Sequence, residues 1–69
     1  MLRDKTVIRA LRLALKDPIP SVRIKAAESA GALGQGASSC VSELNEMSMD
    51  KNELVKVAAM AALGKINSK

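Results

Sequence analysis

Histidine and all three aromatic residues (Phe, Tyr and Trp) are absent from this chain of 69 residues. Without imidazole, the chain cannot form a histidine-dependent catalytic triad, an imidazole general base or a histidine metal site. Without aromatic rings, its interior must be built from Leu, Ile, Val, Met and Ala, and hydrophobic residues make up 48% of the sequence. We therefore expect a small aliphatic core, no enzymatic activity and no cofactor.

Cys40 is the single cysteine, so no disulfide can form within the chain. A small domain without disulfides is typical of a reducing compartment, and we predict an intracellular protein, cytoplasmic or nuclear. One thiol cannot make a structural zinc site, and we interpret Cys40 as a packing residue. No stretch approaches the roughly 18 consecutive apolar residues of a membrane-spanning helix, so we expect no membrane span.

Two local patterns have explanations other than catalysis. Residues 31–36 contain three glycines, but they follow a predicted helix, whereas glycines that hold a phosphate follow a strand. Four carboxylates lie close together in the second half, and we interpret them as a solvated surface. They are Glu43, Glu46, Asp50 and Glu53.

The chain repeats itself after 33 residues. A fixed period of this length is typical of stacked helical repeats. The aligned pairs include Asp17 with Asp50, Val22 with Val55, Arg23 with Lys56, Ala26 with Ala59, and Gly31 with Gly64. The sequence is therefore predicted to contain two copies of one structural unit, about residues 4–36 and 37–69, within a single domain spanning residues 1–69.

Each copy has apolar residues at helical spacing, interrupted once by turn residues. We expect the first helix over residues 4–16, because Pro18 and Pro20 prevent its continuation. A second helix begins at about Pro20 and ends at Gly34–Gly36. The third begins with Ser38 or Ser39 as its N-cap and ends near residue 50, and Asn52 caps the fourth. The predicted class is all-α, with four helices in two hairpins.

Each predicted helix has an apolar stripe that we expect to face the core. In the first copy the stripes are Ile8, Leu11 and Leu15, then Val22, Ala26, Ala30 and Leu33. In the second copy they are Val41, Leu44 and Met47 or Ser48, then Val55, Ala59, Ala62, Leu63 and Ile66.

These residues resemble the HEAT-repeat family, in which an Asp in the turn precedes, by six residues, a base that opens the second helix. The run Val55–Gly64 is similar to the family pattern, whereas the first copy departs from it at Ile19, where Asp or Asn is usual. The resemblance implies an α-solenoid of stacked hairpins, part of a longer array, that acts as a scaffold or adaptor for protein-protein interaction. It also implies a structural hydrogen-bond ladder formed by Asp17, Arg23, Asp50 and Lys56. Candidate partner-binding residues on the solvent side of the second helix of each copy are Lys25, Glu28, Ala61 and Lys65.

Charge is concentrated in the first copy. Residues 1–36 hold seven basic and three acidic side chains, and residues 37–69 hold four of each, so the net charge of +4 comes from the first half. Spacings of four, three and four place four bases on one face of the first helix. They are Lys5, Arg9, Arg12 and Lys16. This face favours an alternative function, binding of a nucleic acid or another anionic surface, although no aromatic residue is present to stack on bases.

The last predicted helix is apolar nearly all round, with Leu54, Val57 and Met60 outside its main stripe. A terminal solenoid repeat normally carries a polar outer face. Val57 and Met60, together with Met47 and Met49, leave the C-terminal end without a polar cap. We therefore predict that this end packs against further repeats or mediates self-association.

Overall fold

A computed structural model describes residues 5–67 of the chain. Its elements, in chain order, are α1 (Lys5–Ala14), α2 (Pro20–Leu33), the 3-10 segment η1 (Gly34–Cys40), α3 (Val41–Met47) and α4 (Glu53–Asn67). No strand occurs in this part of the chain, so the all-α prediction is confirmed there. Across the same residues, every helix is too short or too polar to cross a lipid bilayer.

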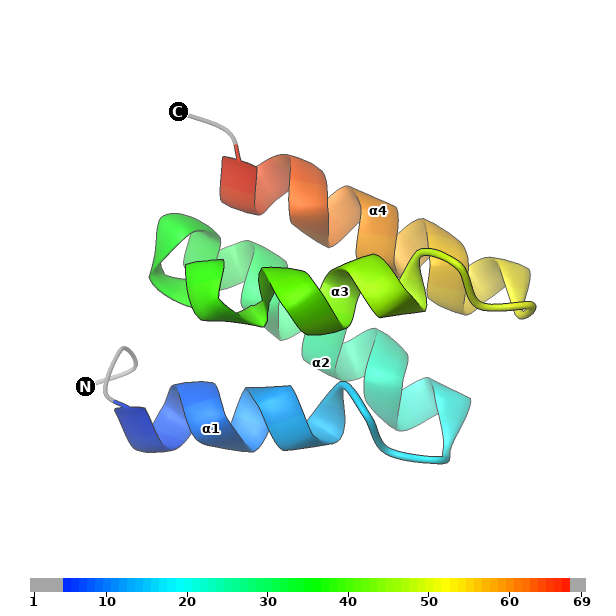
Figure 1. Ribbon diagram of the computed structural model, residues 1–69, viewed down its shortest axis with the longest axis horizontal. Coiled ribbons are helices and arrows are strands. Elements are labelled where there is room, and N and C mark those ends of the chain that lie inside the picture. The colour runs from blue at the N-terminus through cyan, green and yellow to red at the C-terminus, as the bar shows by residue number, and fades with distance from the viewer. Residues whose placement is uncertain (1–4, 68–69) are drawn as a thin grey trace.

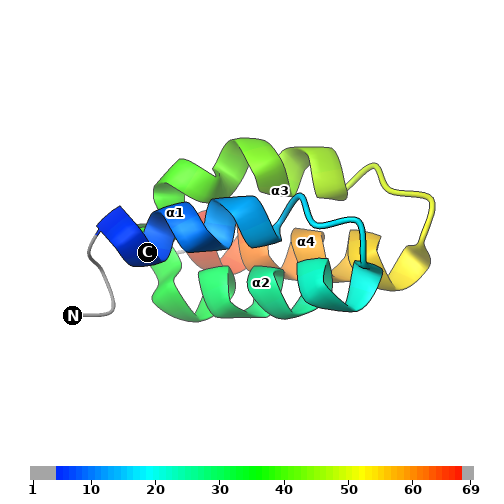
Figure 2. The same ribbon diagram turned by 90° about the horizontal axis from the view of Figure 1, so that it is seen from below.

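The helices form two layers, with α1 and α3 on one side and α2 and α4 on the other (Figure 2). Figure 1 shows that α1 and α3 run in one direction and that α2 and α4 run in the opposite one. The main contact between helices joins α2 to α4, and α3 packs on α4. The core therefore lies where α4, α2 and the η1–α3 segment meet.

The core is aliphatic, as the composition predicts. Leu44, Val55 and Cys40 have no exposed surface, and Leu15 has almost none. Complete burial of a leucine or valine side chain stabilises a fold by about 1.5–3 kcal/mol. The α4 stripe is confirmed at Val55, Ala59, Ala62 and Ile66, all of which are buried.

The stripe of α1 is only partly confirmed. Leu15, in the turn that follows the helix, is buried, whereas Ile8 and Leu11 are half-buried and α1 itself contains no buried residue. On α2, Ala26 and Ala30 are buried as predicted. The first copy therefore contributes fewer fully buried side chains than the second.

The two ends of α2 and the N-terminal end of α4 are set by residues at or next to those ends. Ile19 adopts an extended conformation before Pro20 opens α2, and Gly34 ends the helix with φ of +60°. Gly34 is the only residue in the range 5–67 with positive φ, a conformation that glycine adopts without steric cost. Asn52 caps α4, because its Oδ1 accepts hydrogen bonds from the amides of Leu54 (2.9 Å) and Val55 (3.3 Å).

Three helix boundaries differ from the prediction. Ser38 and Ser39 do not cap α3; they lie inside η1, and α3 begins at Val41 after Cys40, whose side chain makes no capping hydrogen bond. The backbone of η1 is interrupted at Ala37 (φ −104°, ψ 22°), and the helical run that follows joins α3, with the backbone amide of Val41 donating to the carbonyl of Ser38. At their C-terminal ends, α1 stops at Ala14 and α3 at Met47, each followed by a turn that replaces the predicted last turn of helix.

Gly31 allows α2 and α4 to approach closely. A Cβ atom at this position would lie 3.4 Å from Ala62 Cα and 3.3 Å from Lys65 Cδ. The aliphatic stem of Lys65 therefore crosses α2 at the glycine. The equivalent Gly64, one repeat later, has no atom within 4 Å of its would-be Cβ.

Candidate interaction surfaces

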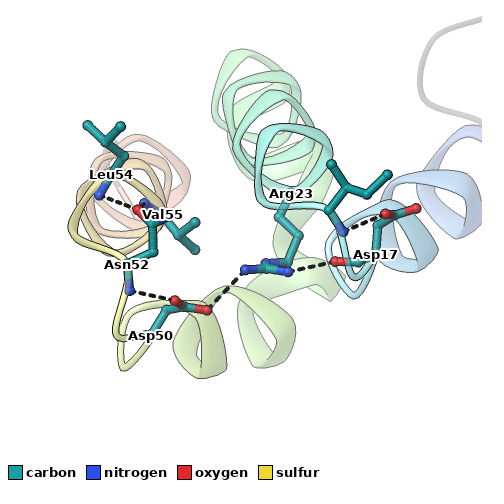
Figure 3. A network of polar contacts seen from close by, with 7 residues as sticks. Asp17, Arg23, Asp50, Asn52, Leu54 and Val55 are labelled. Carbon is teal, nitrogen blue, oxygen red and sulfur yellow. Dashed lines mark hydrogen bonds and ion pairs between the residues drawn. The ribbon is translucent and has the colours of Figure 1, made fainter.

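A hydrogen-bond network joins the two turns that precede α2 and α4 (Figure 3). Arg23 Nη1 donates to the backbone carbonyl oxygen of Asp17 at 2.7 Å, and Nη2 donates to Asp50 Oδ2 at 3.2 Å. The side chains of Arg23 and Asp50 are only 16% and 27% exposed, so water competes weakly for this ion pair. One guanidinium thus connects the first copy to the second.

The same turn occurs twice in the chain. Asp17 Oδ1 accepts a hydrogen bond from the amide of Ile19 at 2.9 Å, and Asp50 Oδ1 accepts one from the amide of Asn52 at 2.7 Å. Three of the four predicted ladder residues are therefore brought together. The fourth, Lys56, is half-buried on α4 and forms no ion pair with any residue from 5 to 67.

The predicted basic face lies along α1. Lys5, Arg9, Arg12 and Lys16 are all exposed, and Arg9 and Arg12 border two shallow hollows on this surface. Arg12 Nε donates to Glu43 Oε2 on α3 at 3.0 Å. Three of the four bases therefore remain without an ion pair among the residues described.

Glu43 corrects the interpretation of the carboxylates as a solvated surface. Its side chain is only 5% exposed, and its Oε1 atom has no hydrogen-bond partner among residues 5–67. Burial opposes ionisation of the carboxyl, but hydrogen bonds from its own amide and from Arg12, and the charges of Arg12 and Lys16, outweigh burial and lower the pKa. Glu43 is therefore a buried carboxylate whose charge is balanced across the layer by α1.

A signal for this burial exists in the sequence. Glu43 lies three residues after Cys40 and four before Met47, both of which are buried, so it continues an apolar stripe at helical spacing. The repeat also aligns Glu43 with Ala10, a small apolar residue. Glu46 is exposed as predicted, and Asp50 is half-buried.

The candidate partner-binding residues are all exposed on the layer formed by α2 and α4. Lys25 and Glu28 form an ion pair at 3.7 Å in which both side chains are largely exposed. On α4, Ala61 lies on the outer surface beside Leu54 and Val57, which are 72% and 55% exposed. We call Leu54, Val57 and Ala61 the outer strip.

An open apolar groove lies between α1 and α2, on the side of the molecule away from α4. We call it the α1–α2 groove; its volume is about 610 Å³. Its apolar lining is Val7, Ala10, Leu11, Ala14, Val22 and Ala26, and its polar lining is Thr6, Ser21, Lys25 and Ser29. Lys25 therefore lies on the groove wall, at the edge of the α2–α4 layer. The sequence did not predict this groove.

The opposite end of the molecule carries a second apolar surface. Met60 is 57% exposed, and Lys56, Leu63 and Gly64 share its side of α4. We call these four residues the C-terminal end face. Met47 and Val57 do not belong to it, which corrects the prediction for this end. Met47 is buried at 4% exposure, as its predicted place in the core stripe of α3 requires, and Val57 lies on the outer strip. Met49, in the turn after α3, is exposed as predicted.

The remaining chemistry is sparse. Burial raises the pKa of the Cys40 thiol, with a smaller contribution from the charge of Glu43, and the thiol is fully covered, as a packing residue would be. Across residues 5–67, no group of three or more His, Cys, Asp or Glu side chains is placed to hold a metal ion.

In comparisons with known proteins, no family model, no curated protein and no solved structure matches the chain.

Proposed function

We propose that this chain is a non-catalytic scaffold of the HEAT-repeat type that binds another protein through the outer surface of α2 and α4. The observation that carries the proposal is the outer strip, which exposes Leu54 and Val57 at 72% and 55%. Exposed aliphatic residues bordered by charged ones are typical of protein interfaces. Glu28 and Lys65 supply that charged border on the same layer.

The HEAT-type assignment has independent support from the turns. Equivalent Asp residues, 33 positions apart, each accept a hydrogen bond from the amide two residues later. Arg23 then links its own turn to the next one. A repeated turn joined by a shared base fits a stack of equivalent hairpins, each supported by its neighbour.

Site-specific photo-cross-linking in cells tests the proposal. A cross-linker at Ala61, on the outer strip, should give a discrete adduct with a second protein, whereas one at the exposed Asn45 of α3 should not. The change Leu54→Asp, on the outer strip, should remove that adduct without lowering the melting temperature, because the Leu54 side chain is 72% exposed. Equal cross-linking at Ala61 and Asn45, or loss of folding in the Leu54 variant, would contradict the assignment.

A second candidate function is binding of a nucleic acid or another anionic surface by α1. The observation that favours it is the row of four exposed bases, of which Arg12 alone is paired with a carboxylate in the described chain. Three unpaired bases predict that the logarithm of affinity falls with the logarithm of salt with a slope of about −3. Titration of labelled single-stranded and duplex DNA and RNA at several salt concentrations measures this slope, and absence of binding at low salt would eliminate the candidate.

A further inference from the structure

The α1–α2 groove and the C-terminal end face lie at opposite ends of the stack, and each is the open counterpart of a surface that is covered inside the molecule. The repeat of 33 residues makes this comparison residue by residue. Seven of the ten groove residues have buried equivalents in the second copy, with exposures of 0 to 5%. The equivalents of Thr6, Ser21 and Lys25 are not buried; they are Ser39, Leu54 and Ala58. The buried equivalents are Cys40, Glu43, Leu44, Met47, Val55, Ala59 and Ala62.

The surface that covers them comes largely from α2. Ala27, Ala30 and Gly31 are buried on the side of α2 that packs against α4, and Gly31 is close to Ala62. The residues 33 positions later in the sequence, which are their equivalents in the second copy, are Met60, Leu63 and Gly64, and all three belong to the C-terminal end face. There Met60 and Gly64 are exposed and Leu63 is half-buried. Each end of the molecule therefore holds one half of an interface that already exists in its middle.

From this equivalence we infer that the C-terminal end face of one copy of the chain binds the α1–α2 groove of a second copy, head to tail. A second copy is the occupant because one chain carries both complementary surfaces. The interaction is separate from the proposed function, which uses the outer strip. It requires no protein other than the chain itself.

Charge complementarity supports this partner. Inside the molecule, Arg23 donates to Asp50 at 3.2 Å. The equivalent pair across the intermolecular contact is Lys56 of one copy with Asp17 of the next. In the described chain Lys56 has no ion pair, and Asp17 uses Oδ1 for the Ile19 amide, so Oδ2 is available to accept the ammonium. Docking therefore brings together a cation and a carboxylate oxygen that are both unpaired in one copy.

The sizes of the facing side chains are also compatible. The end face presents Met60 and Leu63 where the internal interface presents alanines, so it projects further. The groove, open with a volume of about 610 Å³, leaves room for these longer side chains. Lys25 lines the groove wall in place of Ala58, and its aliphatic stem can pack against the methionine while its ammonium stays in water.

Sedimentation velocity over a range of protein concentrations tests the inference. For the unmodified chain, the weight-average mass should rise above that of a monomer as concentration increases. Met60→Asp disables the end face, and Ser29→Glu places a carboxylate in the groove where the equivalent Ala62 is buried. Each variant alone should remain a monomer, and an equimolar mixture should form a species of two chains, because each variant retains the surface that the other lacks.

Ala61→Asp is the matched control, since it introduces the same charge on an exposed position of α4 outside the end face. It should associate like the unmodified chain. Lys56→Glu, which opposes Asp17 with a like charge, should weaken association about tenfold. Far-UV circular dichroism establishes that each variant is folded. A purely monomeric unmodified chain at every concentration, or a mixture of the two blocked variants that stays monomeric, would overturn the inference.

Discussion

The two halves of this molecule share one sequence pattern but differ in what covers them. Leu44 and Val55 of the second half have no exposed surface, whereas their equivalents Leu11 and Val22 are half-buried and line an open groove. The difference arises because α2 packs against α4, while no described element packs against the groove side of α1 and α2. Identical hydrophobic spacing thus produces core or surface according to whether a neighbouring hairpin is present.

The largest predicted effect comes from removing equivalent leucines. Leu44→Ala leaves a cavity in a fully packed site and should destabilise the fold by about 2–5 kcal/mol, enough to unfold so small a domain. Leu11→Ala, at the half-buried groove, should cost only about 1–2 kcal/mol. Thermal unfolding at low protein concentration, followed by far-UV circular dichroism, measures both. Equal losses would show that the halves do not differ in packing as described.

Equivalent bases give the next largest contrast. Arg23→Ala removes two hydrogen bonds and leaves Asp50 half-buried without its cation, so we expect a loss of about 1–3 kcal/mol. Lys56→Ala should change the stability of a single copy by less than about 0.5 kcal/mol, because Lys56 has no ion pair within residues 5–67. Urea unfolding of the two variants compares them, and a larger loss for Lys56→Ala would reverse the assignment.

The paired glycines sharpen the comparison further. Gly64→Ala should stabilise α4 by about 0.5–1 kcal/mol, since nothing lies within 4 Å of the new methyl group and alanine favours a helix. Gly31→Ala should gain less, because its methyl group would lie 3.3 Å from Lys65 Cδ, which must shift, and 3.4 Å from Ala62 Cα on the packed helix. Melting temperatures of the two variants provide the measurement. A gain at Gly31 equal to that at Gly64 would contradict the close contact between α2 and α4.

The smallest predicted effect is a pH dependence that arises from Glu43. The folded protein holds the pKa of this carboxyl below its ordinary value of 4.5, so its stabilising contribution is complete above pH 4.5. The contribution is lost as the pH falls through the lowered pKa of the folded state. It should be about 1 kcal/mol or less, because Arg12 is 51% exposed.

Glu43→Gln is the control for this titration, since an amide of the same shape has no charge to lose. Unfolding curves at neutral and acidic pH should show a smaller acid-induced loss for the variant than for the unmodified chain. Identical pH profiles would mean that Glu43 does not contribute.

Local chemistry made much of the fold predictable. Pro20 and Gly34 set the ends of α2, and Asn52 caps α4, because each effect depends on residues within one helical turn. Ser38 and Ser39 failed as caps because the helical backbone resumes directly after the break at Ala37, so both serines lie inside the helical run instead of before it. The position of this break depends on packing, since Ala37 and Cys40 are held in the core.

The surfaces were less predictable than the helices. The burial of Glu43 depends on Arg12, 31 residues away, and the groove depends on how α1 lies against α2. The turn network was easier to anticipate, because both Asp residues and their bases recur at one spacing. Long-range packing therefore accounts for most of what the sequence left undetermined.

The parallel course of α1 with α3, and of α2 with α4, also has a consequence for symmetry (Figure 1). Helices related by a dyad perpendicular to them would run in opposite directions, and a dyad parallel to them would exchange the two layers. Because α1 and α3 share both direction and layer, as do α2 and α4, the operation that relates the halves resembles a translation. A contact between molecules that repeats this operation is heterologous and leaves one unsatisfied surface at each end. Such a contact sets no fixed stoichiometry, so the length of any assembly would depend on concentration or on a terminating partner.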